Sequence, residues 1–82
     1  MNKIYKVQMR WDNEAEVWTA ISKDNLGLAL EHASFDTLVY KVRLALPELL
    51  ELQGLVCEEI DIELIASHRE KVCSKHYHLY KL

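Results

Sequence analysis

Hydrophobic positions between residues 35 and 54 recur with the spacing of a single helix face. Asp36 or Thr37 is expected to accept hydrogen bonds from the free backbone N–H groups at the start of this helix. Gly54 is expected to end it in the left-handed conformation. Pro47 falls inside the pattern, but the apolar stripe continues in phase across it, so we predict one helix that kinks there. The stripe consists of Leu38, Val42, Ala45, Leu49 and Leu52.

This stripe is wider than one core-facing surface requires. Val39, Leu46 and Leu50 broaden it to roughly 160°, whereas contact with one core needs about 100°. Two interpretations follow from this width. The helix is either sunk deep in a small core, or it meets its own sheet on one side and a second apolar surface on the other.

Most of the remaining chain alternates like β-strands. Residues 4–11 and 17–22 predict two strands, and the polar turn at 12–16 predicts a hairpin between them. Residues 28–33 predict a weaker third strand, and residues 56–66 a fourth whose acidic side faces solvent. This order predicts an α+β domain with an antiparallel sheet of three or four strands and one helix on one face.

Charge divides the chain into an acidic body and a basic tail. Residues 1–67 carry six Lys/Arg against twelve Asp/Glu, a net charge of −6, and residues 68–82 carry four Lys/Arg against Glu70 alone, a net charge of +3. We therefore assign one domain to residues 1–67 and a basic tail to residues 68–82. An acidic body favours a basic partner and disfavours nucleic acid. No apolar run approaches the length of a membrane span and no leader pattern opens the chain, so a cytoplasmic protein is expected.

The sequence contains no convincing arrangement for catalysis, metal binding or cofactor binding. Gly27 and Gly54 are the only glycines, too few for a phosphate-binding loop. The carboxylates do not converge as a two-metal nuclease requires, and a solvated acidic face is the better interpretation. The tail histidines with Cys73 match no zinc-finger spacing, and Cys57 and Cys73 are expected to be free thiols. We expect no enzyme activity, no metal and no cofactor. The tail cluster consists of His68, Cys73, His76 and His78.

Several short segments, in this element order, resemble a known fold. Trp18-Thr19-Ala20 lies in the second strand, Ser34-Phe35-Asp36-Thr37-Leu38 opens the helix, and Ala45-Leu46-Pro47-Glu48-Leu49-Leu50 follows. Together, over residues 4–66, they resemble the HicB-like antitoxin fold, and more closely a family of small uncharacterised bacterial proteins placed beside HicB. The resemblance implies a truncated ribonuclease-H-like βββαβ domain. It also implies a protein that neutralises a small basic ribonuclease toxin by binding over it.

We therefore expect a non-enzymatic, antitoxin-like module that sequesters a small basic protein. Long-range attraction would come from the acidic side of the fourth strand, and the surplus helix residues Val39 and Leu50 would contact the partner or a second copy. The alternative is an RNA-binding domain that uses the basic tail and exposed aromatic residues. A stand-alone regulatory or oligomeric role is the third hypothesis. The acidic residues are Glu58, Glu59, Asp61 and Glu63, and the basic ones are Arg69, Lys71, Lys75 and Lys81.

Overall fold

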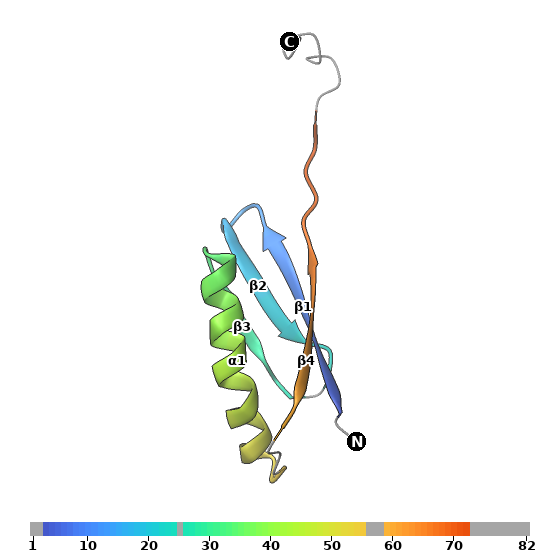
Figure 1. Ribbon diagram of the computed structural model, residues 1–82. Helices are drawn as coiled ribbons and strands as arrows, with labels where there is room; N and C mark the ends of the chain where they lie inside the picture. The colour runs from blue at the N-terminus through green and yellow to red at the C-terminus, as the bar shows by residue number, and fades with distance from the viewer. Residues whose placement is uncertain (1–2, 25, 56–58, 73–82) are drawn as a thin grey trace.

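The described residues form a four-stranded sheet with one helix on one face (Figure 1). The computed structural model describes residues 3–24, 26–55 and 59–72. The elements follow in the order expected from the sequence, so the α+β class and the βββαβ order are confirmed. They are β1 (Ile4–Asp12), β2 (Val17–Ser22), β3 (Ala29–His32), α1 (Phe35–Leu52) and β4 (Asp61–Ser67).

The sheet is mixed, with strand order β3-β2-β1-β4. β1 pairs antiparallel with β2, and β2 antiparallel with β3, but β4 lies beside β1 and runs parallel to it. The expectation of a wholly antiparallel sheet is therefore wrong for β4. The reason is the helical crossover: α1 carries the chain back along the sheet, so β4 starts from the same end as β1 and β3.

The hairpin predicted at 12–16 is present, and an Asx motif closes the turn between β1 and β2. The Asp12 Oδ1 atom accepts hydrogen bonds from the backbone N–H groups of Glu14 and Ala15, at 3.0 and 3.2 Å. Glu16 completes the turn with a left-handed φ of 54°. This turn sets the register in which Trp11 lies opposite Trp18.

The core lies between the inner face of the sheet and α1. Along β1, Tyr5, Val7 and Met9 are buried while Lys6 and Arg10 are exposed, which confirms the alternation expected for this strand. Ala20 of β2 and one stripe of α1 complete the centre of the core. That stripe consists of Leu38, Val42, Leu46 and Leu50, all at most 1% exposed.

Ser34, rather than Asp36 or Thr37, caps the start of α1. Ser34 is extended, with φ −95° and ψ 125°, and its hydroxyl accepts a hydrogen bond from the Thr37 backbone N–H at 3.3 Å. Asp36 and Thr37 lie within the first turn, so the expected cap is wrong by two or three residues. Phe35 is the first helical residue, and its ring packs edge-on against Trp18.

The end of α1 follows the expectation for Gly54. Gly54 has φ 77°, and its N–H donates to the Glu51 carbonyl at 2.9 Å. The Leu55 N–H donates to the Leu50 carbonyl at 2.9 Å, which completes a Schellman motif. α1 runs through Pro47 as one helix, which confirms one element across the proline.

β4 confirms the predicted division of its two faces. Asp61 and Glu63 are exposed, while Ile62 and Leu64 are half-buried on the inner side. The strand begins at Asp61, later than the expected position 56. Residues 56–58, with which the predicted strand began, lie outside the described residues.

The helix cap at Ser34 should contribute to the stability of the fold. We expect Ser34→Ala to lower the free energy of unfolding by about 1 kcal/mol, because the Thr37 N–H loses its acceptor. Equilibrium urea unfolding measures this loss. Thr37→Ala is the matched control and should cost less, because it leaves the hydrogen bond intact and alanine favours helix. Equal losses in the two variants would contradict the assignment of the cap to Ser34.

Candidate interaction surfaces

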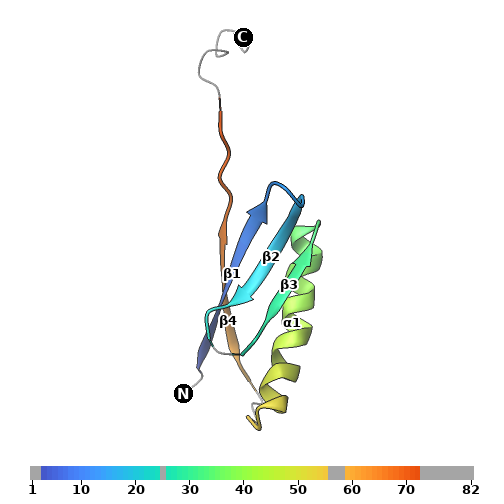
Figure 2. The ribbon, with the colours of Figure 1, turned by 180° about the vertical axis from the view of Figure 1, so that it is seen from behind.

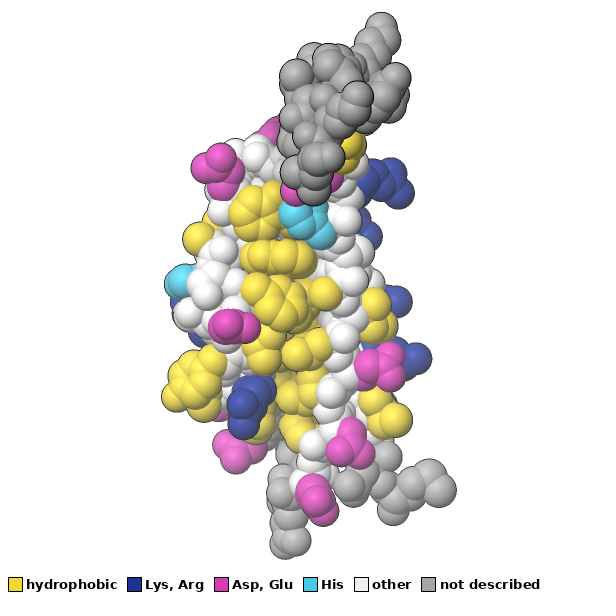
Figure 3. Space-filling view, turned by 45° about the horizontal axis from the view of Figure 1, so that its top comes forward, with side chains coloured by type: hydrophobic (Ala, Val, Ile, Leu, Met, Phe, Trp, Pro, Cys, Tyr) yellow, Lys and Arg dark blue, Asp and Glu magenta, His cyan; other side chains and the backbone are white. Residues whose placement is uncertain are grey.

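α1 covers only part of the inner face of the sheet. The helix packs on β2 and β3, and it makes no close backbone approach to β1 or β4. Ile62 and Leu64, on the inner side of β4, are consequently only half-buried. Figure 3 shows a band of hydrophobic side chains that stays open to solvent along the molecule. We call it the α1–β4 surface and define it by Phe35 and Val39 on α1, Ile62 and Leu64 on β4, and Trp11 and Trp18 at its end.

An aromatic cluster closes one end of this surface. The Trp18 ring lies edge-on to Phe35, with centroids 4.8 Å apart, and edge-on to Trp11 at 5.7 Å. His68 lies 5.8 Å from Trp11 and 5.9 Å from Trp18. The Trp11 Nε1–H donates to the Asn13 Oδ1 at 2.8 Å. These contacts join β1, β2, α1 and the segment after β4 in geometries that favour aromatic pairs.

The structure separates the acidic residues from the apolar ones that the sequence grouped with them. Asp61 and Glu63 point to the outer face of the sheet, which no described element covers (Figure 2), and Glu59 precedes them in an exposed position. Val39 is half-buried on the opposite layer. Leu50 is 1% exposed and lies in the core, so its side chain is not available to a partner. The remaining member, Glu58, lies outside the described residues.

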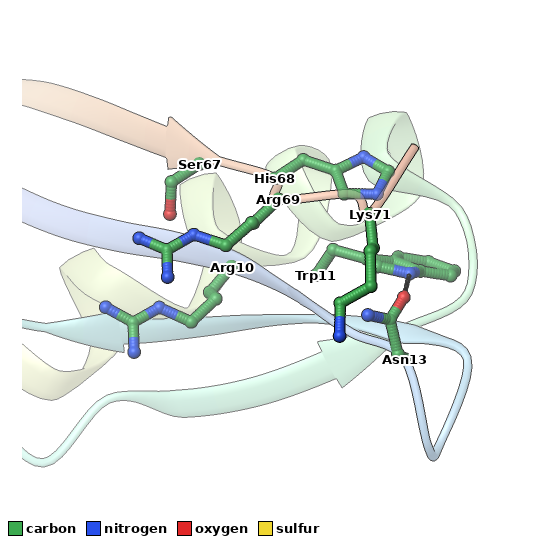
Figure 4. Close-up of a pocket in the computed structure, with 7 residues that line it drawn as sticks. All are labelled: Arg10, Trp11, Asn13, Ser67, His68, Arg69 and Lys71. Atoms are coloured by element: carbon green, nitrogen blue, oxygen red, sulfur yellow. Dashed lines mark hydrogen bonds between the residues drawn. The ribbon is translucent and has the colours of Figure 1, made fainter. Parts of the chain in front are cut away.

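A basic pocket of about 680 Å³ lies where β1 and β4 end (Figure 4). Arg10 comes from β1, and Arg69 and Lys71 from the segment after β4. In Figure 4 the Arg10 and Arg69 side chains extend in the same direction. No acidic residue lines the pocket among the described residues. The other lining residues are Trp11, Asn13, Ser67 and His68.

Sequence reasoning found Arg69 and Lys71 but missed Arg10. The missing information was the parallel register, in which Arg10 lies opposite Ser67. The alternation of side chains along each strand was visible in the sequence. It places Arg10 and Ser67 on the same face of the sheet only when β4 is known to pair with β1 in this register. Lys75 and Lys81, the other two basic residues of the RNA hypothesis, lie outside the described residues.

The described residues show few other groupings that could carry chemistry. Within 3–24, 26–55 and 59–72, no three His, Cys, Asp or Glu side chains gather as metal ligands would. His68 belongs to the aromatic cluster, and its Nε2 atom lies 3.3 Å from the Glu70 Oε1 atom. Cys57 and the tail positions Cys73, His76 and His78 fall outside the described part. No helix in the described part is long and apolar enough to span a membrane.

Comparison with known proteins places the chain in a family. It matches the family described as Domain of unknown function (DUF1902) over residues 4–74, and it therefore belongs to that family. Its structure is similar to the crystal structure of the hypothetical protein TTHA1013 from the extremely thermophilic bacterium Thermus thermophilus. The sequences are 39% identical, the TM-score is 0.65, and the match covers 87% of this chain and 99% of TTHA1013. No curated protein shows a significant match. None of these names mentions HicB or an antitoxin.

The openness of the α1–β4 surface predicts an uneven pattern of stability. We expect Leu46→Ala, at a fully buried site, to lower the free energy of unfolding by about 2–5 kcal/mol. Leu64→Ala should cost only about 1–2 kcal/mol, since part of that side chain already contacts solvent. Urea unfolding at low protein concentration compares the two. Equal costs would mean that the surface is covered in solution.

Proposed function

We propose that the protein is a non-enzymatic binding module of the antitoxin type, which sequesters a small basic protein. The observation that carries this proposal is the α1–β4 surface. A continuous apolar band on a small domain is typical of a protein–protein interaction site. Its two tryptophans and one phenylalanine are of the kind that dominates binding energy at interfaces.

Charge supports a basic partner. The whole chain carries a formal net charge of −3, and residues 1–67 carry −6. Asp61 and Glu63 lie on the outer face, away from the α1–β4 surface, so they would act at a distance rather than by contact. Charges in that position raise the rate of association, while the apolar surface supplies most of the affinity.

The antitoxin class rests on the resemblance to HicB in the segments 34–38 and 45–50. In the structure these segments have packing roles: Ser34 caps α1, and Leu38, Leu46 and Leu50 fill the core. They therefore support a common fold and, through it, a common mode of binding over a partner. The toxin-like nature of the partner comes from the resemblance alone.

RNA binding is the second candidate, and the basic pocket favours it. Arg10, Arg69 and Lys71 together could bind phosphate groups, and arginine binds phosphate in a two-point geometry. The acidic body weighs against this function, because the same outer face carries Asp61 and Glu63.

Val39 provides the test of the first proposal. We expect Val39→Arg to weaken the complex with a basic partner at least ~tenfold, because it adds a cation to the apolar surface. The partner is a small basic protein recovered in stoichiometric amount by affinity capture from the native host. Titration of the two purified proteins then gives Kd.

Leu44→Arg is the matched control, since Leu44 is 54% exposed on the same helix but outside the α1–β4 surface. It should leave Kd unchanged. Val39→Ala, with a smaller expected loss of affinity, covers the case in which Val39→Arg unfolds the protein. Equal binding by all three variants would contradict the proposed surface, and recovery of RNA without protein would favour the second candidate.

A further inference from the structure

β4 is an edge strand with one unused side. It pairs with β1 on one side, and no other described strand borders it. An edge strand presents unpaired backbone N–H and C=O groups, and a strand of a second chain can pair with them. Proline and bulges, which commonly protect such edges, are both missing from Asp61–Ser67. In Figure 1 residues 68–72 continue away from the sheet along the line of β4.

The charges at every second position along this segment change sign halfway. Within β4, every second residue from Asp61 to Ser67 points to the outer face. The same two-residue period, continued past both ends of the strand, adds Glu59 before it and Arg69 and Lys71 after it, and the first three residues of the series are acidic. Ile65 and Ser67 lie in the middle, and the last two are basic. The full series is Glu59, Asp61, Glu63, Ile65, Ser67, Arg69 and Lys71. An antiparallel copy of this segment would place its basic half opposite the acidic half, whereas a parallel copy would place like charges together.

We propose that β4 pairs antiparallel with β4 of a second copy of this chain, around a two-fold axis at Ile65. In this register Asp61 lies opposite Arg69 of the second copy. Glu59 lies opposite Lys71 of the second copy, and each pair occurs twice because the interface is symmetric. The two Ile65 side chains meet at the axis, and Leu64 lies opposite Ala66 on the inner side.

The basic pocket shows that the cationic end of this series lacks counter-charges within one chain. Arg10, Arg69 and Lys71 have no carboxylate among the described lining residues. Over 3–24, 26–55 and 59–72 the single ion pair is that of His68 with Glu70. The proposed register brings Asp61 and Glu59 of the second copy to Arg69 and Lys71. The dimer thus gives counter-charges to a cationic pocket that one chain leaves uncompensated.

The pairing also gives backbone partners to residues that one chain leaves without them. β1 lies beside β4 only as far as Ser67, opposite Arg10. Residues 68–71 continue past this point, and in the dimer they would lie beside residues 59–62 of the second copy. The two sheets would then join into one continuous sheet. Both α1 helices would lie on the same face of it, because paired positions share the same face of the pleat.

A charge exchange tests this proposal. Wild-type protein should be a dimer by analytical ultracentrifugation. One variant carries Glu59→Lys and Asp61→Lys, the other Arg69→Glu and Lys71→Glu. Each alone should lose at least ~tenfold in self-association, because like charges then face each other across the axis. An equimolar mixture should recover dimers, because every charged pair is again opposite in sign.

Glu31→Lys is the control, because it reverses an exposed charge on β3, at the other edge of the sheet, and should leave the dimer intact. Thermal unfolding of each variant checks that it is folded. A monomeric wild-type protein would overturn the proposal. So would folded charge variants whose mixture does not associate, or a pocket that binds single-stranded RNA in a monomer and loses it in Arg10→Gln.

The register is tested by cross-linking at the axis. In a chain carrying Cys57→Ser and Cys73→Ser, Ile65→Cys should form an intermolecular disulfide. Directly opposite residues in an antiparallel pair lie about 4.5–5.5 Å apart between Cα atoms, which suits a disulfide. Ala29→Cys, exposed on β3, is the matched control and should stay reduced. Equal cross-linking at both positions would contradict the β4 register. Val39→Arg should still dimerise, so a failed partner interaction is distinguishable from a failed dimer.

Discussion

One helix has to cover a sheet that is wider than the helix. An α-helix with its side chains is about 10–12 Å across, and strands lie about 4.8 Å apart, so one helix spans little more than two strands. α1 lies over β2 and β3 in a sheet of four strands. The other half of the inner face depends on side chains reaching across from α1. These side chains cover β1, where Val7 and Met9 are fully buried. They do not fully cover β4, where Ile62 and Leu64 stay partly exposed.

This limit explains the wide apolar stripe of α1. The sequence allowed two interpretations, a helix buried deep in the core or a helix that also meets a second apolar surface. In the structure, some residues of the stripe lie in the core and others stay partly exposed. Leu46 and Leu50 are buried in the core. Val39, four residues after Phe35 and hence on the same side of the helix, packs against the core but stays partly exposed. Periodicity reports the angle of a residue around a helix, but burial at that angle depends on how far the sheet extends beneath it.

The same distinction separates what the sequence could predict from what it could not. Alternation in β1 and the role of Gly54 are local properties, governed by side-chain period and backbone strain, and both were predictable. The position of the cap was not predictable, because the side chains of Ser34, Asp36 and Thr37 can all accept the capping hydrogen bond and lie within four positions of each other.

The direction of β4 and the contribution of Arg10 to the basic pocket depend on a pairing between distant parts of the chain. Neither composition nor period specifies that pairing. The partner-binding residues grouped by sequence were likewise divided between the core, the helix side and the outer face. A strand alternates its side chains between two faces, so an acidic series and an apolar series on β4 cannot serve one flat interface.

Pairing at the edge of β4 would involve both the acidic outer face and the apolar inner face of this strand. In the proposed dimer the two β4 strands lie side by side at the centre of the joined sheet, with an α1 helix beyond each of them on the same face. The two α1–β4 surfaces would then border one apolar trough, with Ile62 and Leu64 of both chains on its floor. The charge pairs on the outer face would stabilise the dimer and leave the trough on the inner face free, because neighbouring residues of a strand point to opposite faces. A partner that fills the trough would contact both chains, so dimerisation and partner binding would strengthen each other.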